Sequence, residues 1–175
     1  DADVYPKTEN GLKAWVGVGG SPESVVRAAR YGYGLVLAII GGSSARFRPF
    51  ADLYRRSLDE LGKPQMPISV HSPGHIAETD QQAWEEAYEG VAELNNTIGR
   101  ERGWPEYNRL RFQHDVGPDG SMYIGSPETV ARKIAATVRA LGNSRFQLKF
   151  ASGSISHDRL LSVSYTHLTL PTKRI

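Results

Sequence analysis

AWVGVGGSPESVVRAARYGYGLVLAIIGG, residues 14–42, is the stretch that decides the fold. It begins with an apolar run, 14–18, which two glycines close and which is typical of a buried strand. Ser-Pro-Glu at 21–23 then has the residues of a helix start, with serine as N-cap and proline in the first turn. A second apolar run follows at 35–40. Strand, helix and strand in this order predict two parallel strands, because the helix returns the chain to the same end of the sheet.

The alternation of strands and helices continues along the chain. Pro67–His71 is predicted to be a third strand that ends before Pro73, and Arg145–Phe150 is predicted to be a fourth. Helical patterns lie between the strands, at 44–61, from Asp80 onward and at 127–141, and 103–123 is expected to be irregular. Parallel strands covered by helices define an α/β fold, either an open doubly wound sheet or a barrel.

Composition limits the classes of function. Hydrophobic residues make up 39% of the 175 residues and charged residues 23%, as in globular domains. The 21 basic residues are interspersed with 19 acidic ones, so nucleic acid is not an expected partner. Cysteine is absent, which excludes a disulfide framework and a thiolate metal site. No apolar run is long enough to span a membrane and no signal-peptide pattern opens the sequence, so we expect a cytoplasmic protein.

The first helix start is a candidate anion site. Gly19 and Gly20 allow a ligand close to the backbone, and the N–H groups of the following turn favour an anion. The hydroxyls of Ser21 and Ser24 would add hydrogen bonds. From these residues alone, a phosphate cradle and a simple capped turn remain equally open. Residues 125–132, GSPETVAR, repeat the pattern of 20–27, and there two good N-caps suffice as the interpretation.

Other residues give weaker signals. His71 ends the third strand and is a modest candidate for a polar group beside a ligand, although a structural role is also open. His71 and His75 are four residues apart, but Ser-Pro-Gly between them breaks any helix, so we expect no metal site. Glu85, Glu86 and Glu89 are interpreted as the solvated face of a helix. Motifs of a hydrolase nucleophile are absent from the sequence.

Two segments resemble the bacterial luciferase-like monooxygenase family. They are 14–42, quoted above, and YIGSPETVARKI at 123–134 with the strand that follows at 146–150. The resemblance covers about residues 4–163 and implies a (β/α)₈ TIM barrel of roughly twice this length. The four strands would then be the fifth to the eighth, and residues 1–163 would be the C-terminal half of a barrel domain. The long segment after the third strand would be the insertion that covers the substrate.

The resemblance also implies a flavin enzyme. Gly19, Gly20, Ser21 and Ser24 would hold the phosphate of flavin mononucleotide (FMN). Ile39 and Ile40 would line its isoalloxazine ring. The family uses reduced FMN and dioxygen to oxygenate a small substrate, so a flavin reductase partner and a homo-oligomeric full-length protein are expected. Two alternatives stay open: a deazaflavin coenzyme in the same barrel, or a non-catalytic flavin-binding module. A half barrel is expected to be inactive alone.

The last twelve residues depart from the family pattern. The closing helix should continue past Leu161 as a charged amphipathic stretch, but 164–175 lack both acidic residues and a helical period. We interpret 164–175 as a non-native tail derived from an adapter or vector, which should pack against nothing.

Overall fold

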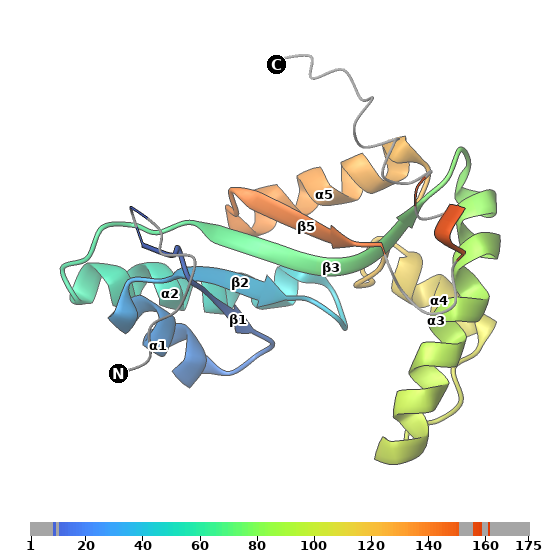
Figure 1. Ribbon diagram of the computed structural model, residues 1–175, viewed down its shortest axis with the longest axis horizontal. Helices are drawn as coiled ribbons and strands as arrows, with labels where there is room; N and C mark the ends of the chain where they lie inside the picture. Colours follow the sequence, from blue (N-terminus) through green and yellow to red (C-terminus); the bar gives the residue numbers. More distant parts are fainter. Residues whose placement is uncertain (1–8, 10, 151–155, 159–160, 162–175) are drawn as a thin grey trace.

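The computed structural model describes residues 9, 11–150, 156–158 and 161 (Figure 1). The predicted tail at 164–175 and most of the expected last helix lie outside these residues. The elements follow the predicted order. They are β1 (Trp15–Val18), α1 (Pro22–Tyr31), β2 (Gly34–Ala38), the 3₁₀ helix η1 (Ser44–Phe47), α2 (Arg48–Glu60), β3 (Ile68–Ile76), α3 (Asp80–Arg102), α4 (Arg109–Val116), β4 (Tyr123–Gly125), α5 (Pro127–Leu141) and β5 (Arg145–Lys149).

The strands form one parallel sheet. β1 pairs with β2, β2 with β3, and β3 with β5, so the four strands expected from sequence lie side by side in chain order. Parallel neighbours in register point their side chains to the same face. The row of Ala38, His71 and Gln147 therefore crosses three strands on one face.

The other face of the sheet packs against helices. α1 contacts α2, and α2 contacts α5, so the three helices form a continuous layer. Figure 1 shows them running alongside the strands, whereas α3 stands across the end to which the strands point. The main core lies between the strands and this layer and includes fully buried Val25, Leu35, Leu37, Tyr54 and Val70. One layer of helices on one face of a parallel sheet is the arrangement of a (β/α)₈ barrel wall.

Two side chains meet across the helix-free face of the sheet. Arg145 on β5 lies over the ring of Trp15 on β1, with its guanidinium carbon 5.9 Å from the ring centroid. These two strands are the outer members of the row β1-β2-β3-β5, so the pair spans the face between them. Gly34 opposite Trp15 has no room for a side chain, because an added Cβ would lie 2.5 Å from the indole.

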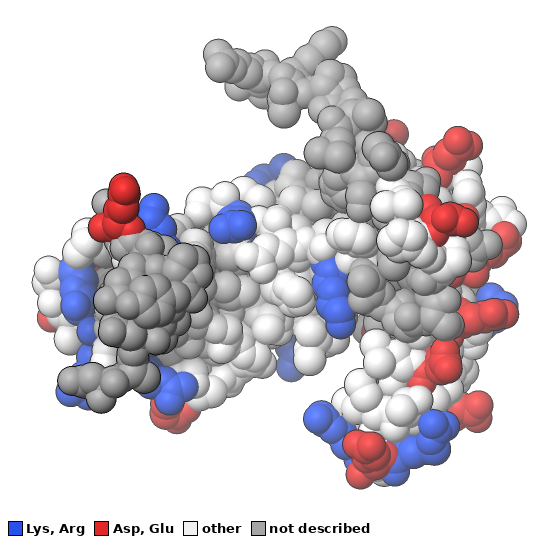
Figure 2. Space-filling view, viewed as in Figure 1, with Lys and Arg blue, Asp and Glu red and all other residues white. Residues whose placement is uncertain are grey.

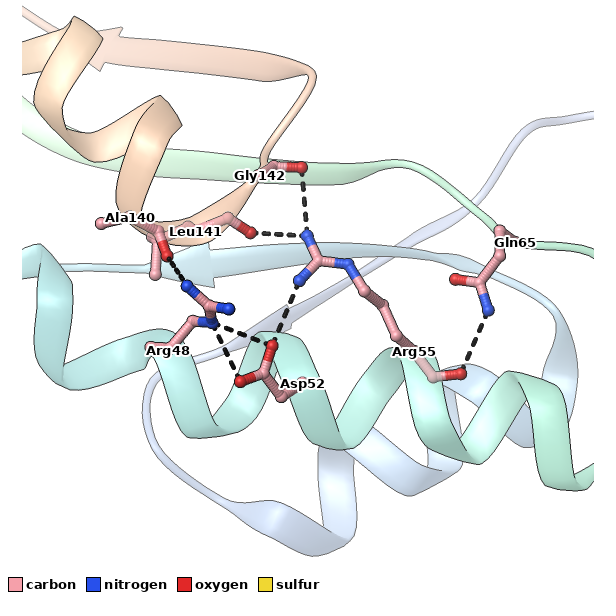
Figure 3. A network of polar contacts seen from close by, with 7 residues as sticks. All are labelled: Arg48, Asp52, Arg55, Gln65, Ala140, Leu141 and Gly142. Carbon is pink, nitrogen blue, oxygen red and sulfur yellow. Dashed lines mark hydrogen bonds and ion pairs between the residues drawn. The ribbon is translucent and has the colours of Figure 1, made fainter.

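Two arginines of α2 hold the end of α5 (Figure 3). Arg48 donates to the carbonyl of Ala140 at 3.0 Å and pairs with Asp52 on its own helix. Arg55 donates to the carbonyls of Leu141 and Gly142. The last carbonyls of a helix lack partners within it, and cations there also complement the helix dipole. The network therefore fixes the spacing of two neighbouring wall helices.

The structure corrects two predicted boundaries. β3 does not end before Pro73 but continues to Ile76, because its pairing changes partner there: Pro73 is the last residue in register with β5, and Gly74 is the first in register with β4. The segment 103–123 is not irregular, since it contains α4 and leads into β4. A second core, formed by α3, α4, β4 and the segments between them, holds this region together and includes Ala87, Tyr107 and Phe112.

Candidate functional site

The start of α1 presents its polar groups to solvent. Ser21 caps the helix by accepting from the backbone N–H of Ser24 at 3.3 Å, as predicted. The Ser24 hydroxyl accepts from Arg27 at 3.1 Å. Ser21 is exposed and Ser24 half-buried, so neither residue is fully buried between the helix and the sheet. Sequence reasoning missed Arg27, although its place three residues after Ser24, on the same side of the helix, was readable.

Open space surrounds the glycines before this helix. A Cβ built on Gly17, Gly19 or Gly20 would meet no atom within 4 Å. Gly20 also has φ of +136°, a conformation that other residues rarely adopt. The loop at the carboxyl end of β1 therefore leaves room at the backbone that side chains would fill.

The start of α5 has the same local structure, but a carboxylate from another helix binds to it. Ser126 caps the helix by accepting from the N–H of Thr129. Asp80, the first residue of α3, accepts from the N–H of Ser126 at 2.6 Å and from the Thr129 hydroxyl at 3.0 Å. The backbone bond from Ser126 is the main reason why the pKa of Asp80 lies below its usual value. A carboxylate from a distant element thus occupies the anion position of the second Gly-Ser-Pro-Glu start.

At the start of α1 the neighbouring carboxylate comes from the helix itself. The Glu23 carboxylate accepts from the Ser21 hydroxyl at 2.8 Å. The pKa of Glu23 is lowered, first by a bond from its own backbone N–H and then by Ser21. Glu23 is exposed, so a ligand can displace it by a side-chain rotation. Both helix starts therefore attract negative charge, but only α5 holds it with a residue fixed elsewhere in the fold.

A cavity of about 300 Å³ lies at the carboxyl ends of β2, β3 and β5. The structure brings two predicted site residues together here, because Ile40 and His71 both line it. Ile39, the other residue expected beside the flavin ring, does not offer its side chain: it is fully buried in the core against the helices. Ile40 in contrast is 74% exposed.

The remaining histidines have other partners. His75 is buried, and its Nε2 lies 2.7 Å from the carboxylate of Glu86. The interpretation of Glu86 as part of a solvated face is therefore wrong, whereas Glu85 and Glu89 are exposed. His114 is exposed beside Asp115. Within the described part of the chain, no group of three or more acidic or histidine side chains is placed to hold a metal ion.

Comparison with known proteins identifies the family. The model of the luciferase-like monooxygenase family matches residues 1–145, so the chain belongs to that family. No curated protein matches the sequence. In the described residues, no helix combines the length and apolar character needed to cross a membrane.

Solved structures with the same fold cover this chain over most of its length. Monooxygenase RslO1 from Streptomyces bottropensis superposes with a TM-score of 0.75 at 17% identity, over 90% of this chain and 46% of that one. The FMN complex of the oxygenating constituent of 3,6-diketocamphane monooxygenase from Pseudomonas putida has a TM-score of 0.57 at 19% identity, over 78% of this chain and 41% of that one. The coenzyme F420 dependent tetrahydromethanopterin reductase from Methanopyrus kandleri has a TM-score of 0.57 at 15% identity, over 85% of this chain and 47% of that one.

The chain spans about half the length of these structures. Its parallel sheet with one layer of helices is thus half of a luciferase-like TIM barrel, as predicted. The family includes oxidoreductases that use FMN and others that use coenzyme F420.

Proposed function

We infer that this chain supplies the phosphate-binding half of an oxidoreductase that uses reduced FMN and dioxygen to oxygenate a small organic substrate. One observation carries the proposal. The start of α5 binds a carboxylate with a backbone N–H and a hydroxyl, and the start of α1 has the equivalent groups without a fixed carboxylate. A helix start that binds an anion in one copy is expected to bind one in the other.

The groups at α1 fit a phosphate. Ser21 and Ser24 would donate their hydroxyls, and Arg27, which already reaches Ser24, would add positive charge. Gly19 and Gly20 leave the space for phosphate oxygens. A phosphate would displace the Glu23 carboxylate from Ser21, which removes one negative charge from the position. Helix N-termini of this kind bind anions through unpaired N–H groups and the helix dipole.

The rest of the coenzyme would extend along the ends of the strands. Ile40 offers an apolar side chain at the end of β2, where the family resemblance expects the isoalloxazine ring. His71 lines the same cavity from β3 and would face the ring or the substrate. Reduced FMN would supply the electrons that activate dioxygen, and the chain would bind, orient and exclude water. A separate flavin reductase would provide the reduced coenzyme.

The test is a titration of the chain with FMN and with riboflavin, which lacks the phosphate, followed by flavin fluorescence. FMN should bind at least about tenfold more tightly, since each factor of ten corresponds to about 1.4 kcal/mol. Ser24→Ala should remove most of this preference. Thr129→Ala is the matched control, because Thr129 stands at α5 where Ser24 stands at α1, and its loss should leave FMN binding unchanged. Equal binding of FMN and riboflavin would contradict the proposal.

The alternatives give different results. A deazaflavin coenzyme, the class to which coenzyme F420 belongs, would bind more tightly than FMN in parallel titrations. A non-catalytic module would bind FMN but, when completed by the missing half of its barrel, would not consume dioxygen with reduced FMN in the presence of substrate.

A further inference from the structure

The cavity at the end of the sheet has walls from two parts of the fold. One side is formed by Ile40, which follows β2, and by the strand residues His71, Pro73 and Lys149. The insertion forms the other, and its lining residues are Val91, Leu94, Asn95, Ile98, Arg102, Trp104 and Met122. A volume of about 300 Å³ is at the lower end of the range for small-molecule sites. The size and the mostly apolar walls suit one small organic molecule.

One part of the wall combines an aromatic ring with a cation. The Arg102 guanidinium lies over the ring of Trp104, 5.3 Å from its centroid, and both residues line the cavity. Trp104 remains 43% exposed although it contacts Gly99 across the turn at the end of α3. Aromatic ligands gain energy by lying against such faces, through offset stacking and cation–π contact. The wall therefore favours a ligand with a ring.

The charges that line the cavity are all positive. Arg102 and Lys149 are its charged residues, and the lining contains no aspartate or glutamate. Neither residue forms an ion pair within the described part of the chain. The outer side of α3 is the opposite, because Glu85, Glu89 and Glu93 are exposed there and Figure 2 shows acidic side chains over this helix. The fold thus keeps the carboxylates of α3 away from a cavity that presents two cations.

We propose that this cavity binds a substrate that combines a ring with an acidic group, and that Arg102 and Lys149 bind the acid. The ring would lie against Trp104 and the apolar side chains of α3. Binding of this ligand does not depend on FMN, although its oxygenation rests on the proposed function. In the proposed function the phosphate of FMN binds at the start of α1 and its ring reaches the same cavity at Ile40, so the ligand is titrated into the chain without FMN.

The experiment compares an acid with its neutral amide. Calorimetric titration of the chain with 3-phenylpropanoate and with 3-phenylpropanamide isolates the acidic group, because the two molecules have the same ring and nearly the same shape. We expect the acid to bind about tenfold more tightly, as for one charge-assisted contact. Trp104→Ala should weaken both ligands, which locates them in the cavity. Equal affinities, or a preference for the amide, would overturn the proposal.

Matched variants distinguish binding of the acid in the cavity from attraction of the acid to any positive charge nearby. Lys149→Gln should reduce binding of the acid several-fold and leave the amide unchanged, whereas Arg102→Gln should weaken the acid more than the amide, because Arg102 also contacts Trp104. The controls remove the same charge nearby: Arg100→Gln on the same helix and Arg145→Gln on the same strand, neither of which lines the cavity. If the control variants weaken binding of the acid as much as the cavity variants do, the assignment of the site to this cavity is wrong. FMN titration of the same variants is independent, since it reports on Ser24; loss of FMN binding with intact acid binding would contradict only the proposed function.

Discussion

The two Gly-Ser-Pro-Glu helix starts have nearly the same sequence and the same cap, but they differ in what faces them. At α5 a carboxylate from α3 accepts from Ser126 and Thr129. At α1 the equivalent Ser21 is exposed and Ser24 half-buried, and their hydroxyls bond to Glu23 and Arg27 of the same helix. The same local sequence therefore forms the same cap twice, and the tertiary structure decides whether a side chain from another element binds to it.

The largest effect is expected when the fixed anion is removed. Asp80→Ala leaves the N–H of Ser126 and the hydroxyl of Thr129 without their acceptor and separates α3 from α5. We expect a loss of about 2 kcal/mol in the free energy of unfolding, within the range for bonds to charged groups. Urea denaturation measures this value. Glu23→Ala is the control at α1 and should leave stability unchanged; if both variants lose the same amount, the two starts are not different in kind.

Adding a methyl group should distinguish Gly125, before α5, from Gly19, before α1. In Gly125→Ala the new Cβ would lie 2.8 Å from the Asp80 carboxylate, so we expect a loss of about 1.5 kcal/mol from overpacking. Gly19→Ala meets open space and should keep the stability of the parent chain. Its effect should appear as weaker binding of FMN relative to riboflavin. A stable Gly125→Ala together with an unstable Gly19→Ala would reverse the assignment of the filled and the open start.

The pH dependence of stability should follow Asp80. Because its pKa is lower in the folded state than the usual 3.8, the carboxylate stabilises the fold above about pH 4, and this contribution is lost as the pH falls through the folded pKa. Asp80→Asn should be less stable than the parent at pH 7 by about 1 kcal/mol. The difference should shrink in denaturation curves taken toward pH 3. A constant difference across this range would show that charge is not what the α5 start recognises.

The smallest effect concerns the arginines one turn into each helix. Arg27 donates to Ser24, whereas Arg132, its equivalent on α5, pairs with Glu128 instead. Arg27→Gln should weaken FMN binding about threefold, as for one exposed charge near a phosphate. Arg132→Gln should not change it. The measurement is the FMN titration at low salt, where exposed charges act most strongly.

Much of the barrel wall could be predicted because local signals agree there. The runs 14–18 and 35–40 are apolar, are bounded by glycine and are joined by a helix with clear caps, so propensity, pattern and turn chemistry all agree. The insertion could not be predicted in the same way. β4 has only three residues, and its pairing with the end of β3 depends on the long-range packing of α3 and α4.

The site was predictable to the extent that it is local. Ser21 and Ser24 are three residues apart on one helix start, and their spacing shows in the sequence. Ile39 and Ile40 could not be separated, because β2 is apolar on both faces and the pattern does not show which residue faces the helices. Asp80 and Glu86 looked like ordinary residues of a charged helix. Their partners, Ser126 and His75, lie 46 and 11 residues away.

The contact of Arg145 with Trp15 gives the spacing of the outer strands an optical signal. An indole between a glycine backbone and a guanidinium has a different emission from one in water, and these two neighbours come from β2 and β5. The emission of Trp15 therefore reports whether β1 and β5 stay close. With Trp84 and Trp104 replaced by phenylalanine, its signal would show whether the outer strands separate before the helices unfold or at the same moment.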